Sequence, residues 1–194
     1  MHLRRSSCAL SMLLAASLTA CTAGSSSSST TSTSAATATI AAPSPSPSPS
    51  LSKAQQAASE AQAAYGRYLA AIDLVYGRGG SGARSAFEKV AAGPALVDVV
   101  EQAAEIQKVG WKQLRGVTTQ SLKVDSVRFP KGQLAQVTLI ACVDVRSRRA
   151  VDAKGRDVTR KVTTPFSKDF ILVTNFVDKG WLVTQDESSE VKSC

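Results

Sequence analysis

The side chains with the most distinctive chemistry in this chain are its four cysteines, at positions 8, 21, 142 and 194. A thiolate can be acylated, oxidised to a disulfide or bound to a metal, depending largely on the compartment. The only histidine is His2, so the rest of the chain has no imidazole for a Ser-His-Asp triad, a histidine base or a His-ligated metal. The sequence also has no Gly-rich phosphate loop, no EF-hand spacing and no cluster of metal ligands. We therefore expect no cofactor and no metal site, and carboxylates remain for acid–base chemistry.

The second cysteine closes a short apolar segment near the start of the chain. Arg4 and Arg5 precede an apolar run of about 13 residues, too short for a membrane-spanning helix of roughly 20, and the run ends in Leu18-Thr19-Ala20-Cys21. This arrangement resembles the lipobox of a bacterial lipoprotein signal peptide. The resemblance implies cleavage before Cys21, a diacylglycerol on its sulfur and often a third acyl chain. The alternatives are an ordinary secretory signal with a chance cysteine and, with a weaker match, a twin-arginine export signal.

The acylated cysteine would set the location of everything that follows it. Each buried methylene contributes about 0.8 kcal/mol, so two or three chains would hold the protein almost permanently in a lipid bilayer. The resemblance therefore places the mature chain on the extracytoplasmic face of a bacterial cell membrane, anchored by lipid.

The segment from Thr22 to Ser52 has the composition of a tether. It consists almost entirely of Ser, Thr, Ala and Pro and carries no charge, so we expect it to be disordered. Its Pro-Ser repeat favours extended polyproline II structure, and its Ser/Thr tract is either an O-glycosylated stretch or a plain spacer. The chain thus divides into a signal peptide (1–20), a lipidated Cys21 with its tether (21–52) and one domain of about 140 residues (53–194).

Two cysteines remain for the domain, because Cys8 leaves with the signal peptide and Cys21 is acylated. In an oxidising exterior Cys142 and Cys194 are expected to form a disulfide. It would close a loop of about 50 residues, for which the chain-entropy model gives roughly 4 kcal/mol, and clamp a polar tail from Asp186 to Ser193. A redox-active pair is the alternative, although the sequence contains no Cys-x-x-Cys arrangement.

The first part of the domain has the apolar spacing of helices. The Ala-rich stretch from Lys53 to Tyr76 predicts a long helix with Ser52 as its N-cap. A short helix over 81–92 is expected next, and Gly93-Pro94 starts a third. One face of the first helix carries Tyr65, Leu69, Ile72 and Tyr76. The side chains expected to point inward from the third helix are Leu96, Val99, Val100, Ala103, Ala104 and Trp111.

After Gly116 the pattern changes to period two and to β-branched residues. Three Gly-containing turns, around residues 132, 155 and 180, divide it into strands at about 117–129, 133–147, 160–177 and 181–187. In the second strand Val137 to Val145 share one face at alternate positions, with Cys142 and Asp144 on the other. The apolar stretch from Phe170 to Val177 indicates a central or covered strand. Helices followed by an antiparallel meander predict an α+β fold with three helices on one face of the sheet.

The residues that carry a family resemblance are Cys142-Val143-Asp144, the strand Gly180-Trp181-Leu182-Val183 and the terminal Cys194. With them, residues 53–194 resemble the nuclear transport factor 2-like fold, which includes SnoaL-like enzymes and many lipid-anchored actinobacterial proteins. The resemblance implies a curved, cone-like sheet of about four strands and often a homodimer formed through it.

Carboxylates are the candidates for the interior of such a cone. Asp73 on the first helix and Asp144 on a strand, with Asp125 as a further option, could line a pocket, where a desolvated Asp could act as a base. The alternative for each is a surface Asp or one bonded to a neighbouring Arg or backbone group.

The positive charge of the chain is concentrated in one segment. The chain has a formal net charge of +8, and residues 146–161 hold seven basic residues against Asp152 and Asp157. Such a segment could contact anionic lipid headgroups or wall polyanions. The alternative is a solvated hairpin that keeps an edge strand soluble. Nucleic acid is not expected, because no aromatic residues interleave the charges. The basic residues are Arg146, Arg148, Arg149, Lys154, Arg156, Arg160 and Lys161.

The leading functional hypothesis is a lipid-anchored envelope protein whose domain binds a ligand, a lipid or a partner protein without catalysis. The alternatives are a structural protein that docks onto the cell wall and a SnoaL-like enzyme with a buried Asp. The fold hosts all of these roles, so the interior must separate them. An unpaired carboxylate in an open pocket favours the enzyme. A purely apolar pocket favours a carrier, and a filled interior with an exposed apolar patch favours docking.

Overall fold

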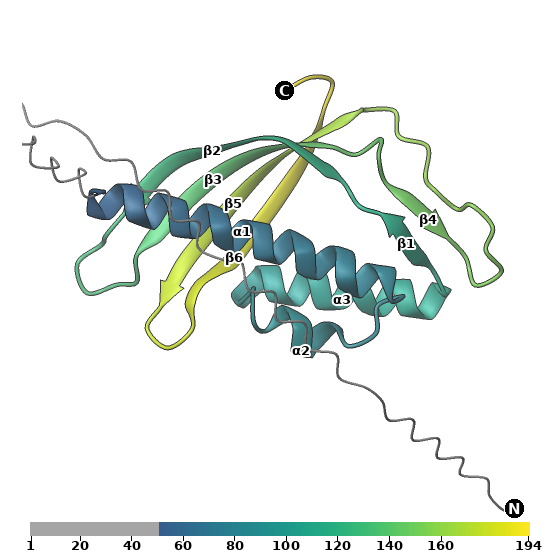
Figure 1. Ribbon diagram of the computed structural model, residues 1–194, viewed down its shortest axis with the longest axis horizontal. Coiled ribbons are helices and arrows are strands. Elements are labelled where there is room, and N and C mark those ends of the chain that lie inside the picture. The colour runs from purple at the N-terminus through teal and green to yellow at the C-terminus, as the bar shows by residue number, and fades with distance from the viewer. Residues whose placement is uncertain (1–50) are drawn as a thin grey trace, which may run out of the picture. The chain divides into compact units, whose positions relative to one another are not determined.

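The computed structural model describes residues 51–194, in which three helices precede a four-stranded antiparallel sheet (Figure 1). The predictions for the signal peptide, for Cys21 and for the tether up to residue 50 lie outside these residues. Within residues 51–194, no helix is both long enough and apolar enough to cross a membrane.

The first helix, α1, spans Lys53–Gly77 and has the predicted N-cap. The hydroxyl of Ser52 accepts a hydrogen bond from the backbone N–H of Gln55, and the Gln55 side chain accepts one from the Ser52 N–H, at 3.2 and 2.8 Å. This reciprocal pair satisfies two of the backbone donors that a helix start leaves open. After α1 the chain turns at Gly80, where φ is +83° and a Cβ would collide with the carbonyl oxygen of Ala103. Glycine therefore allows the turn to pack directly against the third helix.

The second and third helices differ in part from the sequence prediction. Helix α2 covers only Ala83–Phe87, because the chain after it forms a bridge between Ala91 and Val183. Helix α3 spans Gly93–Val109, with Val99 and Ala103 buried as expected. The inward orientation predicted for Trp111 is wrong, and so is that for Ala104, which is exposed. The helix ends at Gly110 with φ of 73°, so Trp111 leaves the helical periodicity and is 42% exposed.

The main sheet has the order β2-β3-β5-β6, with all neighbours antiparallel. Its strands are β2 (Thr118–Arg128), β3 (Gln136–Asp144), β5 (Phe166–Phe176) and β6 (Gly180–Val191). These are the four predicted strands, and β5 has the central position expected for it. The polar tail predicted from Asp186 is instead the second half of β6, which hydrogen-bonds to β5 along its length.

The sequence pattern does not predict two short strands. Strand β1 (Lys112–Arg115) pairs with β4 (Arg149–Val151) in a separate two-stranded sheet. Their polar and short sequences do not show a strand pattern, and tertiary pairing alone fixes them. Strand β4 interrupts the predicted basic hairpin, so β5 begins at Phe166 rather than near residue 160.

The core lies between the helices and the face of the sheet that they cover (Figure 1). Alternate residues of β3 from Val137 to Val143 are buried there, together with Ile171 and Val173 of β5. A fully buried side chain such as Leu139 contributes roughly 1.5–3 kcal/mol relative to an exposed one. On the opposite face Phe170 is 43% exposed, so the helices cover only one side of β5 at this position.

Candidate functional site

A cavity of about 340 Å³ lies between α1, α3 and the second half of β6. Its lining is aromatic and charged, with a single basic residue, Arg148. All three tyrosines of the chain contribute to it. The aromatic and acidic residues of this acidic pocket are Tyr65, Tyr68, Tyr76, Asp98, Glu101, Asp169 and Asp186.

Helix α1 supplies the aromatic side because its tyrosines share one helical face. The spacings of three from Tyr65 to Tyr68 and eleven from Tyr65 to Tyr76 return to the same side of a 3.6-residue helix. Tyr65 and Tyr68 are 1% and 2% exposed, and their ring centroids lie 6.3 Å apart. The Tyr76 hydroxyl donates to Gln102 Oε1 of α3 at 3.1 Å. The Tyr65 hydroxyl is buried and makes no hydrogen bond of ordinary geometry within residues 51–194, although the Asp169 carboxylate lies close enough to help raise its pKa.

A β-bulge in β6 aims one acidic side chain at the tyrosines. Val183 pairs with Val173, but Gln185 pairs with Leu172, so Thr184 is an extra residue in β6. Regular alternation after Val183 would turn Gln185 toward the helices, and the extra residue turns Asp186 there instead. The Thr184 hydroxyl donates to the Leu172 carbonyl at 3.1 Å and so supports the bulge.

The second buried carboxylate comes from β5. Asp169 is 7% exposed and pairs across the sheet with Ser188, two residues beyond Asp186. Its Oδ1 accepts a hydrogen bond of 2.6 Å from the Ser167 hydroxyl. The Oδ1 atom of Asp186 is buried without a hydrogen-bond partner in the described part of the chain. Two neighbouring strands therefore direct carboxylates into the same pocket with little compensation from the protein.

Burial and like charges shift the proton affinities in this pocket. Desolvation, together with the charges of Asp169 and Asp98, raises the pKa of Asp186 to about 6, although the nearby Tyr68 hydroxyl acts to lower it. The same desolvation, with the charges of the two carboxylates, holds the pKa of the Tyr65 hydroxyl far above its ordinary value. Burial raises the pKa of Tyr76 to about 12 although Arg148 acts in the opposite direction. At neutral pH the tyrosines are therefore hydrogen-bond donors and Asp186 is mostly ionised.

The carboxylates proposed from the sequence are not those that line this pocket. Asp73 accepts a hydrogen bond from Gln113 Nε2 at 2.8 Å and packs on the backbone of Gly116, and burial raises its pKa. Asp125 is exposed on β2.

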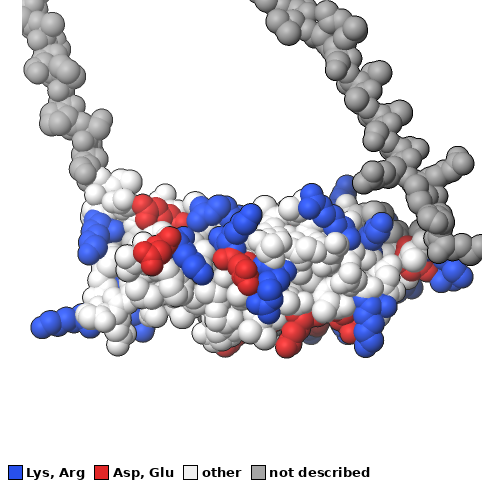
Figure 2. Space-filling view, turned by 90° about the horizontal axis from the view of Figure 1, so that it is seen from below, with Lys and Arg blue, Asp and Glu red and all other residues white. Residues whose placement is uncertain are grey.

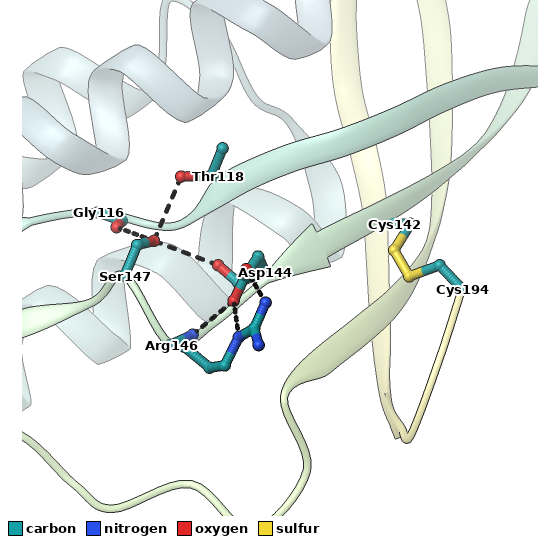
Figure 3. A network of polar contacts seen from close by, with 7 residues as sticks. All are labelled: Gly116, Thr118, Cys142, Asp144, Arg146, Ser147 and Cys194. Carbon is teal, nitrogen blue, oxygen red and sulfur yellow. Dashed lines mark hydrogen bonds and ion pairs between the residues drawn. A yellow bond between two sulfur atoms is a disulfide. The ribbon is translucent and has the colours of Figure 1, made fainter.

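Asp144 does not line the acidic pocket either. It faces Arg146, whose guanidinium donates to both carboxylate oxygens at 3.0 and 2.6 Å and holds the pKa of Asp144 below its usual range (Figure 3). The neighbouring Ser147 hydroxyl donates to the Gly116 carbonyl at 3.0 Å and joins the end of β3 to the start of β2. Asp144 thus has the alternative role considered for it, as the partner of a neighbouring arginine.

Three of the seven basic residues in segment 146–161 pair with nearby carboxylates. Besides the Arg146–Asp144 pair, Arg149 contacts Asp157 at 3.0 Å, and Arg156 contacts Asp152 at 2.6 Å. Arg148 faces the acidic pocket. The four basic residues of this segment without an ion pair inside residues 51–194 are Arg148, Lys154, Arg160 and Lys161.

The distribution of charge on the surface agrees with this local pairing. On the lower side of the domain, basic and acidic side chains are interspersed, and no single-sign area occupies this face (Figure 2). Contact between the basic segment and an anionic surface remains a prediction.

The structure pairs Cys142 with Cys194, as predicted, with their Cα atoms 5.9 Å apart (Figure 3). Because β5 lies between β3 and β6, the chain after Val191 must cross β5 to reach Cys142. The disulfide therefore fastens the second half of β6, which carries Asp186, to the middle of the sheet.

A larger hollow of about 560 Å³ lies between α2 and α3, but its lining offers little chemistry. It is open to solvent, and its only charged residues, Arg84 and Glu88, form an ion pair with each other at 3.1 Å. The acidic pocket is therefore the better candidate for a functional site.

Sequence reasoning missed this pocket for two reasons. Tyr65 and Tyr76 share one face of the predicted first helix with Leu69 and Ile72, and such a stripe indicates core packing rather than a binding site. The pocket carboxylates come from three separate elements, α3, β5 and β6. Asp186 faces inward because of a β-bulge that the sequence pattern does not predict. One usable signal was Asp169, a lone acidic residue that directly precedes the apolar stretch of β5.

No protein-family model and no curated protein sequence matches the chain. Among solved structures, the chain is similar to the intermembrane-space region of the chloroplast protein ARC6, with 18% identity and a TM-score of 0.51. The match covers 74% of this chain and 100% of the other. A designed β-sheet protein matches 66% of this chain and 87% of its own at 15% identity, but with a TM-score of only 0.31. At these identities the first likeness concerns the fold alone.

Proposed function

We propose that this chain is a lipid-anchored protein of the extracytoplasmic face of a bacterial cell membrane, and that its domain holds a small ligand in the acidic pocket without transforming it. The lipobox-like Leu18-Thr19-Ala20-Cys21, the Ser/Thr/Pro tether and the disulfide support the location. We further propose the cone of the nuclear transport factor 2-like fold, supported by the order of helices and strands.

One observation carries the ligand-binding role: two residues that line the pocket each have a buried polar atom without a hydrogen-bond partner within residues 51–194. Buried polar atoms are hydrogen-bonded in the large majority of cases, and an unsatisfied one costs about 1–3 kcal/mol. These atoms are the Tyr65 hydroxyl and Asp186 Oδ1. A bound ligand that forms hydrogen bonds with both atoms would recover that free energy. Ligand binding would therefore explain why a stable domain keeps this cavity.

The ligand can be sought by recovering it with the protein. The full chain is purified from envelopes of its own cells, and small molecules released by denaturation are identified by mass spectrometry. Ser188→Trp, which fills the rim of the pocket, is compared with Ser189→Trp on the opposite face of β6. We expect a compound that accompanies the wild type and Ser189→Trp but not Ser188→Trp. Recovery of the same compounds from all three proteins would contradict the proposal.

The anchor is tested separately with a clickable fatty acid. Wild-type protein should be labelled and remain with the membrane fraction, whereas Cys21→Ser should be unlabelled and released. Equal labelling of both proteins would refute the anchor and leave the ligand question open.

A SnoaL-like acid–base enzyme is the second candidate, favoured by Asp186 rather than by Asp73 or Asp144. A carboxylate with a pKa of about 6 in a pocket has the proton affinity of a useful general base, and a Tyr65 hydroxyl without a partner could donate to a developing oxyanion. This candidate requires that the bound compound exchange a carbon-bound hydrogen with deuterated water. It also requires that Asp186→Asn slow the exchange at least 100-fold.

A further inference from the structure

We propose that the acidic pocket selects a small organic cation, with a primary ammonium group between α1 and β6. This inference rests on the proposed ligand-binding function and adds the chemical class of the ligand.

The charge of the pocket is opposite to that of the protein around it. The chain as a whole is at +8, yet the pocket gathers Asp98 and Glu101 from α3, Asp169 from β5 and Asp186 from β6. Arg148 is the only basic side chain in the lining. Low-dielectric walls focus such a field, so the pocket attracts cations and repels anions.

The carboxylates of Asp169 and Asp186 repel each other, and a bound cation would remove this unfavourable interaction. Asp169 is buried, and Asp186 has an oxygen that lacks any partner within residues 51–194. Repulsion between them contributes to the raised pKa of Asp186. An ammonium group beside both would neutralise this repulsion and donate to the open oxygen.

The aromatic side of the pocket fits the same ligand. Tyr65 and Tyr68 both line the cavity with their ring centroids 6.3 Å apart, and aromatic rings attract ammonium groups. The free Tyr65 hydroxyl can bond to a polar substituent of the ligand, which is the second open group of the pocket.

A metal ion is a poorer occupant. In the described part of the chain, no group of three or more Asp, Glu, Cys or His side chains is placed to hold a metal. The volume of about 340 Å³ is near the lower end of ligand pockets, which run from roughly 300 to 1,000 Å³, and so favours a small molecule.

The tyrosines give a direct test because all three of them line the pocket. The full chain is labelled with ¹³C-tyrosine, and the ring signals are followed by NMR during titration with n-butylammonium, n-butanol and butyrate. We expect saturable shifts of Tyr65 and Tyr68 with butylammonium, and at least tenfold weaker binding of the other two compounds. Binding should weaken at least tenfold as the pH falls from 7.5 to 4.5, because Asp186 becomes protonated.

Two variants of neighbouring residues sharpen the test. Asp186→Asn should weaken butylammonium binding at least tenfold, since it removes a charged acceptor. Glu187→Gln removes the same charge from the opposite, exposed face of β6 and should change the affinity less than twofold. Equal affinity of wild type and Asp186→Asn would overturn the proposal.

The remaining outcomes separate this inference from the proposed function. Saturable binding of butanol or butyrate, with no binding of butylammonium, would refute the proposed selectivity for cations but would still support a ligand-binding pocket. If no probe binds, the proposed selectivity for cations is also refuted. The copurification experiment then decides the proposed function. N-acetyl-lysine amide binding tenfold tighter than butylammonium would identify a lysine side chain as the source of the ammonium.

Discussion

The acidic pocket and the basic segment 146–161 treat charge in opposite ways. In the basic segment, three arginines pair with carboxylates at most eight residues away, and these arginines are exposed to water. In the pocket, carboxylates from three separate elements meet with one arginine and no internal partner for Asp186 Oδ1 in the structure described. Charge that is conspicuous in the sequence is thus partly paired with nearby carboxylates, whereas charge that is scattered in the sequence is gathered in the pocket, where one carboxylate oxygen is uncompensated within residues 51–194. The uncompensated region is the one expected to bind.

The largest expected effect concerns the disulfide that fastens the pocket strand. Replacing both Cys142 and Cys194 by serine removes the closure of a 52-residue separation and should lower the free energy of unfolding by about 4 kcal/mol. Hydrogen exchange should rise in residues 186–191, beside the pocket, but not in residues 146–161. Denaturant titration and exchange mass spectrometry measure the two effects. Equal increases of hydrogen exchange in both regions would contradict the claim that the disulfide stabilises the pocket strand and not the basic segment.

A smaller effect of opposite sign is expected from Asp186→Asn. The folded-state pKa of Asp186 is raised from 3.8 to about 6, so its ionisation destabilises the fold above pH 6, and this cost disappears as the pH falls below about 4. A shift of this size corresponds to at most about 3 kcal/mol. The variant should therefore unfold at higher denaturant concentration than the wild type at pH 7.5, and the difference should shrink toward pH 4.

The control for this comparison is again Glu187→Gln, whose stability should follow the wild type at both pH values. A loss of stability in Asp186→Asn at pH 7.5 would show that the carboxylate is compensated within the fold. The pocket would then resemble the basic segment instead of contrasting with it.

The smallest effect is expected in the basic segment itself. Asp157→Asn breaks the contact with Arg149, in which both side chains are more than half exposed. Exposed ion pairs contribute little, because water already solvates both groups and salt screens them. Thermal denaturation should show no resolvable change in the midpoint. A clear decrease would mean that local pairing in this segment stabilises the domain.

The sequence predicted the framework of this domain better than its site. The N-cap at Ser52, the order of helices and strands, the central place of β5 and the Cys142–Cys194 pair follow from local chemistry and from periodicity. Strands β1 and β4 were missed because they are short, polar and defined only by their pairing. The identity of the inward carboxylate depends on one extra residue, Thr184, which reverses the alternation of β6. A bulge of this kind arises from strand pairing that a linear pattern does not encode.

The most direct measurement of the central claim is a crystal structure of the protein grown with n-butylammonium at pH 7.5. The account predicts an ammonium nitrogen within hydrogen-bond distance, about 2.7–3.2 Å, of an Asp186 carboxylate oxygen, with its alkyl chain against the Tyr65 and Tyr68 rings. A pocket without the cation in which Asp186 bonds to Arg148, or turns outward to water, would contradict it.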